Sequence, residues 1–460
     1  MFIREIPIKF AQKRSFRGLI FFTFLEIILF STIIIYPSFS LYFVLPFLFI
    51  FFISAILFDF TYGIVFLLIS IFFGKIELIQ TPPLFYIDII LTFLILLIFL
   101  SRAYLNQYSV SFSVPLIFLL LSLFLLYCGI TLQRSKSFVW GILSLRYLFS
   151  GLLVLVFIDN VIIGKNQIQK LFNFIIIWGL LLSIQIFVVS SREGNLQTDE
   201  FHKGLYLNWG RSNYLASFLI LIIPMAYSLS FSKMQSYKKR IYYWIAFLMM
   251  MGALILTGSR GGFLAIVFPL LLLTKKFLRT KKVFFYFTVI IIPFIAVYFK
   301  EAFLYVFTGL VHIDKQITVL TRVINWINSW KIFLEHPLVG VGYGNLGYYI
   351  KNIFEKNTSA HNIVLSLLGE TGIIGFIIFS CLFYQIIKIQ LNNCKSLQGE
   401  EDHLMAWGVF AGTIGVLLHS LVEPSIWGYQ MQILLWTVFG IAIKQFTLIE
   451  RNYTFKTMLK

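Results

Sequence analysis

The feature that most constrains the fold is a succession of long apolar runs that fills almost the whole chain. Hydrophobic residues make up 59% of the 460 residues, and charged residues only 12%. A run of about 20 apolar residues is long enough to cross a bilayer as a helix. The composition therefore excludes a soluble globular protein and predicts an all-α, polytopic membrane protein.

The charges and prolines that bound the apolar runs predict a bundle of about 12–14 transmembrane helices. We expect a single membrane domain over residues 1–460. The expected spans are residues 18–37, 40–58, 60–74, 86–101, 112–131, 138–159, 171–190, 212–231, 241–258, 261–274, 283–299, 361–387, 404–422 and 428–447. The first run is too long for the apolar part of a signal peptide, and no small-residue cleavage site follows it, which favours an uncleaved span.

Basic residues predict which side of the membrane each loop faces. They cluster in short loops, at residues 233–240 and 275–282 for example, which indicates the cytoplasmic side. The net charge of +18 is then explained by loops that face anionic lipid, and nucleic-acid binding is not expected. With both termini inside, the two large external segments are residues 191–211 and 300–360.

Metal and cofactor motifs are absent from the sequence. The three cysteines, Cys128, Cys381 and Cys394, have no CxxC spacing, so neither a disulfide framework nor a zinc site is implied. There is no GxxxxGK[ST], HExxH or DxD motif, and no dense His/Asp/Glu cluster. We therefore expect no metal and no cofactor.

The external segment 300–360 is the longest interruption of the apolar pattern. It contains TRVINWINSWKIFLEHPLVGVGYGNLGYY, and the next span follows from SAHNIVLSLLGETGIIG. Irregular polar backbone cannot lie unpaired in hydrocarbon, so the segment must lie outside the bilayer. The spacing of Arg322, Trp326 and Trp330 predicts an amphipathic helix along the membrane surface. His361 stands where the chain enters the bilayer again.

Arginines and this histidine are the candidate chemical groups at the external face. Arg260, in TGSRGG, lies where two spans meet, between glycines that allow close backbone approach, and its guanidinium could grip a phosphate bidentately. Arg322 and Arg211 could do the same. The alternative for each is an interfacial arginine that reaches lipid headgroups. His361 could accept a proton near neutral pH, although a lone histidine is more often structural.

Two carboxylates remain to be explained. Glu423, in HSLVEPSIWG, is expected at the external face, where it could orient His361 or an arginine. Glu370 is expected about 14 Å inside the helix that begins at His361. Such a deep carboxylate needs a partner, and Arg146 in the span 138–159 is the candidate for a structural ion pair.

Together these motifs resemble the superfamily of bacterial O-antigen ligases and polysaccharide polymerases. The likeness rests on TGSRGG at Arg260, on the R-x3-W element at Arg322 followed by EHPLVGVGYGN, and on His361-Asn362 with Gly372-x-x-Gly375 after it. Arg211 and Arg260 also fit an associated R-x3-L pattern. The motifs cover about residues 190–380, and the rest of the chain agrees by hydropathy alone.

The resemblance implies a metal-independent, inverting glycosyltransferase in the bacterial inner membrane, with its active site facing the periplasm. The donor would be a glycan on undecaprenyl diphosphate and the acceptor a sugar hydroxyl of lipid A-core or of another glycan. His361, Arg260 and Arg322 would be catalytic. Arg211, Asn362, Trp326 and Glu423 would bind substrate. Segment 300–360 would be a lid that positions the acceptor, and membrane lipids and other envelope polysaccharide assembly proteins would be partners.

Other readings stay open at this point. Polymerisation of lipid-linked repeat units and protein O-glycosylation belong to the same chemical class. A lipid-linked oligosaccharide flippase or transporter would instead place ionisable residues along a midplane cavity, whereas the candidates here gather at the external face. A purely structural scaffold gives no reason for a segment that carries histidine and arginine together.

Overall fold

The computed structural model describes residues 63–65, 68, 112–162, 164–192, 206–207, 210–277, 313–350 and 359–458. Contacts between residues divide the chain into two compact units, Met1–Gly63 and Ile64–Lys460, and the description below concerns the second unit. Of the expected spans, 18–37, 40–58, 86–101 and 283–299, and most of 60–74, lie outside the described residues. The total of 12–14 spans and the single membrane domain therefore stay predictions.

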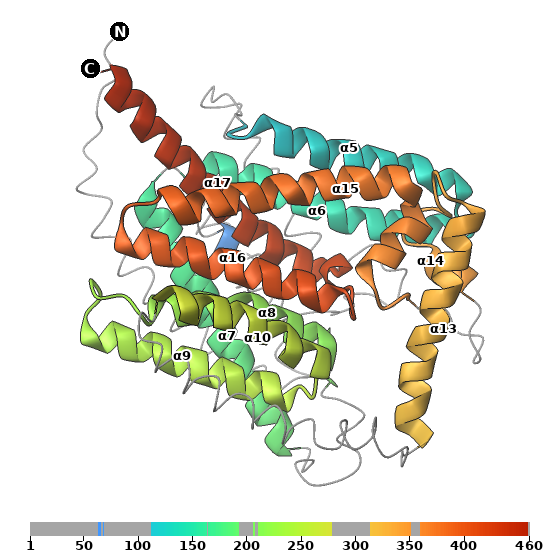
Figure 1. Cartoon of the computed structure of the whole chain (residues 1–460), viewed down its shortest axis with the longest axis horizontal. Coiled ribbons are helices and arrows are strands. Elements are labelled where there is room, and N and C mark those ends of the chain that lie inside the picture. Colours follow the sequence, from blue (N-terminus) through green and yellow to red (C-terminus); the bar gives the residue numbers. More distant parts are fainter. Residues whose placement is uncertain are drawn as a thin grey trace, which may run out of the picture. The chain divides into compact units, whose positions relative to one another are not determined.

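Helices make up nearly all of the described chain, which confirms an all-α fold (Figure 1). They are α5 (Pro115–Thr131), η1 (Leu132–Arg134), α6 (Phe138–Val161), α7 (Lys165–Arg192), α8 (Ser212–Leu229), α9 (Tyr237–Leu256), α10 (Arg260–Phe277), α13 (Ile313–Glu335), α14 (Leu346–Tyr349), α15 (Ile363–Ser396), α16 (Glu400–Ser420), η3 (Ser425–Trp427) and α17 (Tyr429–Met458). Two short strands, β1 (Tyr206–Leu207) and β2 (Gly210–Arg211), form an antiparallel pair before α8.

Eight helices within the described residues are long and apolar enough to cross a membrane, so the chain is a multi-pass membrane protein. The spans are Pro115–Arg134, Phe138–Val161, Lys165–Ser191, Ser212–Leu229, Tyr237–Leu256, Ile363–Ser396, Glu400–Ser420 and Gln430–Leu448. They agree with the spans expected from the sequence to within a few residues at most ends. The expected span 261–274 lies within α10, which is not one of these eight helices. The 18 residues of α10 include three charged ones, Arg260, Lys275 and Lys276.

The centre of the unit is formed by α8, α16 and α17. In the spans of α8 and α17, 83% and 89% of the residues are buried, against 33% in α9. A stripe of Gly408, Gly412 and Gly415 on α16 faces α8, and a Cβ added at Gly412 would lie 2.3 Å from the carbonyl oxygen of Leu221. Small residues let the two backbones approach closely, as is usual where membrane helices pack.

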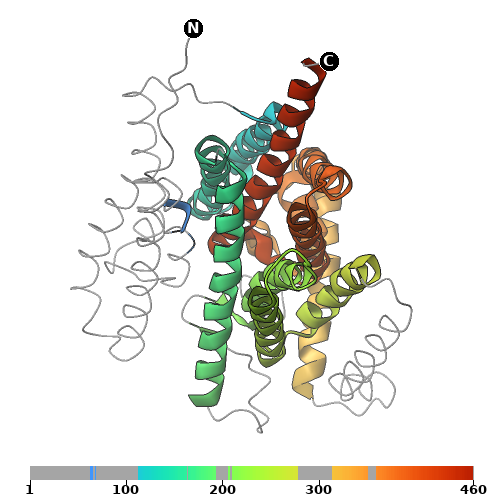
Figure 2. The ribbon, with the colours of Figure 1, turned by 90° about the vertical axis from the view of Figure 1, so that its left-hand side faces the viewer.

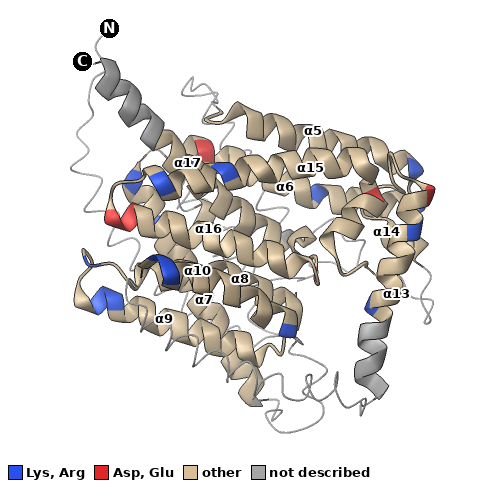
Figure 3. Cartoon of the chain, in the orientation of Figure 1, with Lys and Arg blue, Asp and Glu red and all other residues tan. Residues whose placement is uncertain are grey.

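Helix α13 runs across the ends of the other helices (Figure 1). When the view is turned by 90°, α8 and α9 are seen almost end-on, while α13 keeps its full length (Figure 2). Lys and Arg gather at the opposite end, where α9 begins and where α10 and α15 finish (Figure 3). The last turns of α10 and α15 supply Lys275, Lys276 and Lys395 to this basic end.

Helix α15 is broken at Gly372, which has non-helical angles of φ 63° and ψ −168°. The backbone groups released by the break bond to the loop after α13: Val341 N donates to Gly369 O and Gly342 N to Glu370 O, both at 3.0 Å, and Ile373 N donates to Pro337 O at 2.8 Å. Gly340, Gly342 and Gly344 all have positive φ. A Cβ at Gly340 would lie 2.4 Å from the Glu370 backbone. Glycine at this position therefore allows the loop to approach the backbone of α15 closely.

Candidate functional site

The carboxylate of Glu423 is the centre of a polar cluster between the end of α16 and η3. Its Oε2 atom accepts a hydrogen bond from His361 Nδ1 at 3.1 Å and another from Asn213 Nδ2 at 3.0 Å. Arg322 Nη2 lies 4.0 Å from the same oxygen. Three of the residues predicted from the sequence, His361, Arg322 and Glu423, are therefore brought together, although they come from three separate segments of the chain.

The charge of this carboxylate is fixed by its neighbours. Burial of the Glu423 carboxyl acts to raise its pKa, but hydrogen bonds from His361 and Asn213, the charge of His361 in its protonated form and the charge of Arg322 together outweigh burial. The pKa of Glu423 is therefore lower than usual, and the group is ionised at neutral pH. An ionised carboxylate can only accept hydrogen bonds. His361 Nδ1 must then carry a proton, which leaves the lone pair of the neutral ring on Nε2.

The backbone of His361 is held in an uncommon conformation. Its φ of 51° lies in the left-handed region, which costs a non-glycine residue about 1–2 kcal/mol. Its backbone N–H donates to Ser359 Oγ at 3.2 Å. The side chain is 30% exposed, so the ring lies at the edge of the bundle and can be reached from outside it. Backbone strain of this kind is often found at active sites and ligand-binding sites.

Asn362 fixes the helix that follows the histidine. Its Oδ1 accepts from the N–H groups of Val364 and Leu365, so it is the N-cap of α15, and its Nδ2 donates to Leu421 O at 2.9 Å. The side chain therefore joins the first turn of α15 to the chain just before Glu423. These contacts give Asn362 a structural role, and its predicted role in substrate binding stays a prediction.

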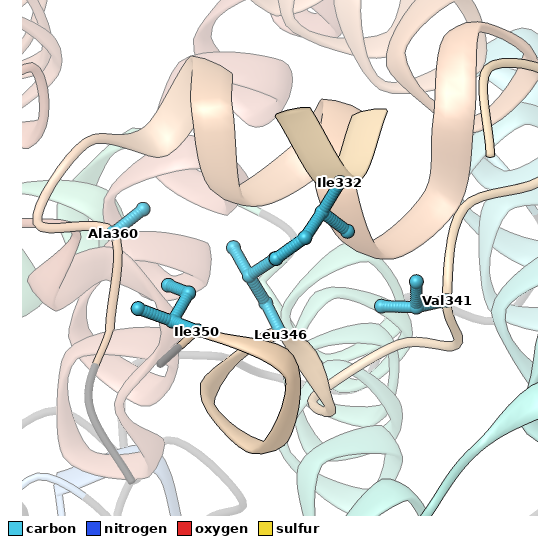
Figure 4. Packing of buried hydrophobic residues seen from close by; sticks show 5 residues of the cluster. All are labelled: Ile332, Val341, Leu346, Ile350 and Ala360. Atoms are coloured by element: carbon cyan, nitrogen blue, oxygen red, sulfur yellow. The ribbon is translucent and has the colours of Figure 1, made fainter. Parts of the chain in front are cut away.

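Helix α13 is anchored beside the site by a small apolar cluster (Figure 4). The cluster joins α13, the glycine loop, α14 and the residue before His361, and consists of Ile332, Val341, Leu346, Ile350 and Ala360. Asn325 Nδ2 also donates to Ser359 O at 3.2 Å. These contacts position Arg322, whose side chain is 32% exposed.

The two tryptophans of α13 differ in their exposure. Trp330 is 47% exposed, with Val323, Ile327 and Leu334 on the same outer stripe. Trp326 is half-buried, and its indole N–H has no hydrogen-bond partner among the described residues. The outer stripe agrees with an interfacial helix; Trp326, one turn before Trp330, lies at the edge of this stripe. Substrate binding by Trp326 stays a prediction.

Arg260 begins α10 and is exposed. The glycines after it allow close packing, as the sequence predicted, but against α16 and α8 and not mainly against α9. A Cβ at Gly261 would lie 2.7 Å from Val422 Cγ2, and one at Gly262 would lie 2.9 Å from Ala216 Cβ. The backbone of Arg211 ends β2, immediately before α8. The side chain of Arg211 lies outside the described residues, so its predicted role is not tested.

Sequence reasoning missed a group of small polar residues beneath Glu423. Asn213 accepts from Ser259 Oγ at 2.7 Å, and Ser217 Oγ contacts His419 Nδ1 at 2.8 Å and also the hydroxyl of Ser425. His419 is 1% exposed. Serines and asparagines near span ends are common, so the sequence carries no signal for this network beyond the polar letters in NWGRSNYLA and HSLVEPSIWG.

The proposed pair of Arg146 and Glu370 stays a prediction. Glu370 Oε2 accepts a hydrogen bond from Gly344 N at 3.0 Å, so this carboxylate helps hold the glycine loop against α15. Arg146 donates from Nη2 to Tyr147 OH at 3.3 Å. Within the described residues, no three His, Cys, Asp or Glu side chains gather as a metal site would require.

The site thus offers an imidazole oriented by a carboxylate, with one arginine in the same cluster and a second at the start of α10. Residues 245–380 match the O-antigen ligase family (Wzy_C), and this range contains Arg260, Arg322 and His361 but not Glu423. None of the curated proteins matches the chain. The match agrees with the resemblance to the O-antigen ligase superfamily that the motifs predicted, over this part of the chain.

Proposed function

We propose, from the match of residues 245–380 to the O-antigen ligase family, that this protein transfers a glycan from undecaprenyl diphosphate to a sugar hydroxyl of lipid A-core. The observation that carries the proposal is the 3.1 Å contact between His361 Nδ1 and Glu423 Oε2. It orients the imidazole and assigns the proton to Nδ1, so Nε2 is able to act as a base.

The reaction is a displacement at the anomeric carbon of the glycan. His361 Nε2 takes the proton of the acceptor hydroxyl, whose oxygen forms the new bond to the anomeric carbon. The bond from that carbon to the diphosphate oxygen breaks, and the diphosphate leaves with the electron pair. Attack opposite the leaving group inverts the anomeric centre. Glu423 stabilises the imidazolium that forms, as a carboxylate does in other histidine-based sites.

The arginines supply the second part of the chemistry. Negative charge develops on the diphosphate as the bond breaks, and fixed cations that face developing charge usually contribute the largest catalytic effect. Arg260 is exposed and forms no ion pair among the described residues, so its whole charge is available to the leaving group. The guanidinium of Arg322 lies 4.0 Å from the Glu423 carboxylate, which neutralises part of its charge. Arg322 is therefore placed beside His361, the proposed base. With both cations in these roles, the step requires no metal ion.

The site is proposed to face the periplasm. The basic end of the bundle, formed by the start of α9 and the ends of α10 and α15, lies opposite the end at which α15 begins (Figure 3). His361 stands just before the N-cap residue of α15. Basic loop ends are typical of the cytoplasmic side of an inner-membrane protein. In a variant without native cysteines, we expect Lys331→Cys to react with an impermeant maleimide added to spheroplasts and Met234→Cys to react only after lysis. The reverse pattern would overturn the orientation.

Transfer by purified protein in proteoliposomes tests the catalytic proposal. The His361→Ala variant is expected to lose transfer at equal membrane amounts, because it removes the proposed base. His403→Gln, at the opposite end of α16, is the matched control and is expected to keep wild-type transfer. Wild-type transfer by His361→Ala would overturn the role of this histidine.

The acceptor is identified by a gel of the envelope polysaccharide from a deletion strain, with a blot for lipid-linked glycan. Long polymer that accumulates on the lipid carrier, with bare core on the outer-membrane lipid, is the expected result for a ligase. Core capped with a single repeat unit would instead assign the same chemistry to a polymerase that joins lipid-linked repeats. A strain with both products unchanged would contradict the proposed function.

A further inference from the structure

Asn213, in the first turn of α8, makes two side-chain hydrogen bonds that point to opposite parts of the site. Its Nδ2 donates to Glu423 Oε2 at 3.0 Å, and its Oδ1 accepts from Ser259 Oγ at 2.7 Å. The orientation of the amide follows from chemistry: an ionised carboxylate has no hydrogen to give, so the nitrogen must face Glu423. Ser259 Oγ accepts from Gly262 N at 3.2 Å, which leaves its hydroxyl hydrogen for Asn213.

The two partners serve different parts of the proposed reaction. Glu423 orients His361, which takes the acceptor proton. Ser259 immediately precedes Arg260 and bonds the first turn of α10, from which Arg260 reaches the leaving group. We propose that Asn213 is a positioning residue that sets the spacing between the histidine base and the arginine that binds the diphosphate. This inference rests on the proposed function and adds to it a residue that touches neither substrate.

The surroundings of Asn213 are rigid enough for such a role. Its backbone oxygen accepts from Ser217 Oγ at 3.1 Å, and the same hydroxyl contacts His419 and Ser425. Asn213 is thereby tied to the end of α16 and to η3 as well as to Glu423. The close contacts of Gly261 with Val422 and of Gly262 with Ala216 fix the start of α10 between the same helices. A displacement of 1 Å at a site of this kind lowers the rate markedly.

Moving the negative charge from position 423 to position 213 tests the coupling of these two residues with little change of side-chain shape. Asn213→Asp sets two carboxylates against each other and is expected to lower kcat about tenfold. On the background of Glu423→Gln this repulsion between two carboxylates is absent, because position 423 is neutral. There we expect Asn213→Asp to cost less than about twofold. Equal costs on the two backgrounds, or none on either, would overturn the proposal.

Ser259→Ala tests the other hydrogen bond of Asn213. It is expected to raise the KM for the lipid-linked donor about threefold or more with a smaller change in kcat, since it loosens the turn that carries Arg260. Ser183→Ala on α7 is the matched control, because its buried hydroxyl bonds only to Gly179 O, at 2.8 Å, among the contacts described. An equal change in both variants, or no change in Ser259→Ala, would contradict the role of Asn213.

The assay uses full-length protein in proteoliposomes, with undecaprenyl-diphosphate-linked oligosaccharide from a strain that lacks the protein and with core lipopolysaccharide as acceptor. The melting temperature in detergent is measured for each variant, so that loss of fold is separated from loss of rate. If wild-type protein transfers glycan and His361→Ala does not, the proposed function holds whatever the Asn213 variants show. Failure of the coupling alone then refutes only the positioning role.

Discussion

Replacement of Glu423 by glutamine tests the arrangement of the site most directly. Glutamine has nearly the same shape and can still accept a hydrogen bond from His361 Nδ1 through its amide oxygen. It removes only the negative charge, which lies 3.1 Å from the imidazole and about 4.0 Å from Arg322. The fold is thus expected to form, while the imidazolium that appears during transfer loses its compensating charge.

The size of the effect follows from the contact distance. Opposite unit charges 3.1 Å apart attract by about 5 kcal/mol at an effective dielectric constant of about 20, which is an upper limit. Hydrogen bonds that involve a charged group contribute about 1.5–3 kcal/mol net, and glutamine keeps part of this. We therefore expect kcat of Glu423→Gln to fall about 10-fold to 150-fold, at about 1.4 kcal/mol for each factor of ten.

The same variant predicts a pH dependence of stability. The pKa of Glu423 is lowered on folding, so its ionised form stabilises the protein at pH values above its unfolded pKa of about 4.3. This contribution is lost as the pH falls through the lower, folded pKa. The melting temperature of wild type should thus exceed that of Glu423→Gln at pH 7, and the difference should shrink below about pH 4. Wild-type kcat together with a pH-independent difference would refute the reasoning.

Two further predictions concern stability and are checked by denaturant unfolding in detergent. Gly372→Ala would place a Cβ 2.4 Å from the Leu338 backbone at a φ of 63° and should cost about 2–5 kcal/mol, whereas Gly164→Ala, with nothing within 4 Å of its Cβ, should be neutral; equal effects would contradict the account of the break. Lys444 Nζ lies 2.9 Å from Asp159 Oδ1, so Lys444→Met or Asp159→Asn alone should cost about 3–5 kcal/mol, and the double variant should cost less than the sum. Additive losses would show that this buried pair is not coupled.

The spans and the charged part of the site could be predicted from the sequence because each rests on local information. Length and apolarity identify a span, and irregular polar backbone must leave the bilayer wherever it occurs in the fold. His361, Arg322 and Glu423 stood out because ionisable groups are rare in this chain and these three were expected at the same external face. The contact between His361 and Glu423, proposed as one of two roles for the carboxylate, is present in the structure.

The partners of these residues could not be predicted, because they depend on which helices pack together. Asn213 and Glu423 are 210 residues apart in the chain. Spans that are apolar on every side give no periodic signal for the face that meets a neighbour, so the packing of α8 against α16 is hidden. The contact between the GVGYG glycines and the break of α15 at Gly372 also became evident only in the fold.

The break also bears on the expectation that segment 300–360 acts as a lid. Its described part is bonded to the helix that begins after His361: Val341 N and Gly342 N donate to Gly369 O and Glu370 O, both at 3.0 Å. The apolar cluster around Ile332 joins α13 to the same unit. A lid motion of this part would therefore move His361 as well, and it would break the contact with Glu423.

We accordingly expect the glycine loop to behave as part of α15 and not as a mobile cover. In hydrogen exchange of the protein in detergent, peptides that contain the Val341 and Gly342 amides should exchange as slowly as the middle of α15, because both amides are bonded to its carbonyl groups. The same peptides from the protein unfolded in denaturant give the fast reference. Exchange of the glycine loop at that fast rate would restore the lid interpretation and would separate the loop from the histidine.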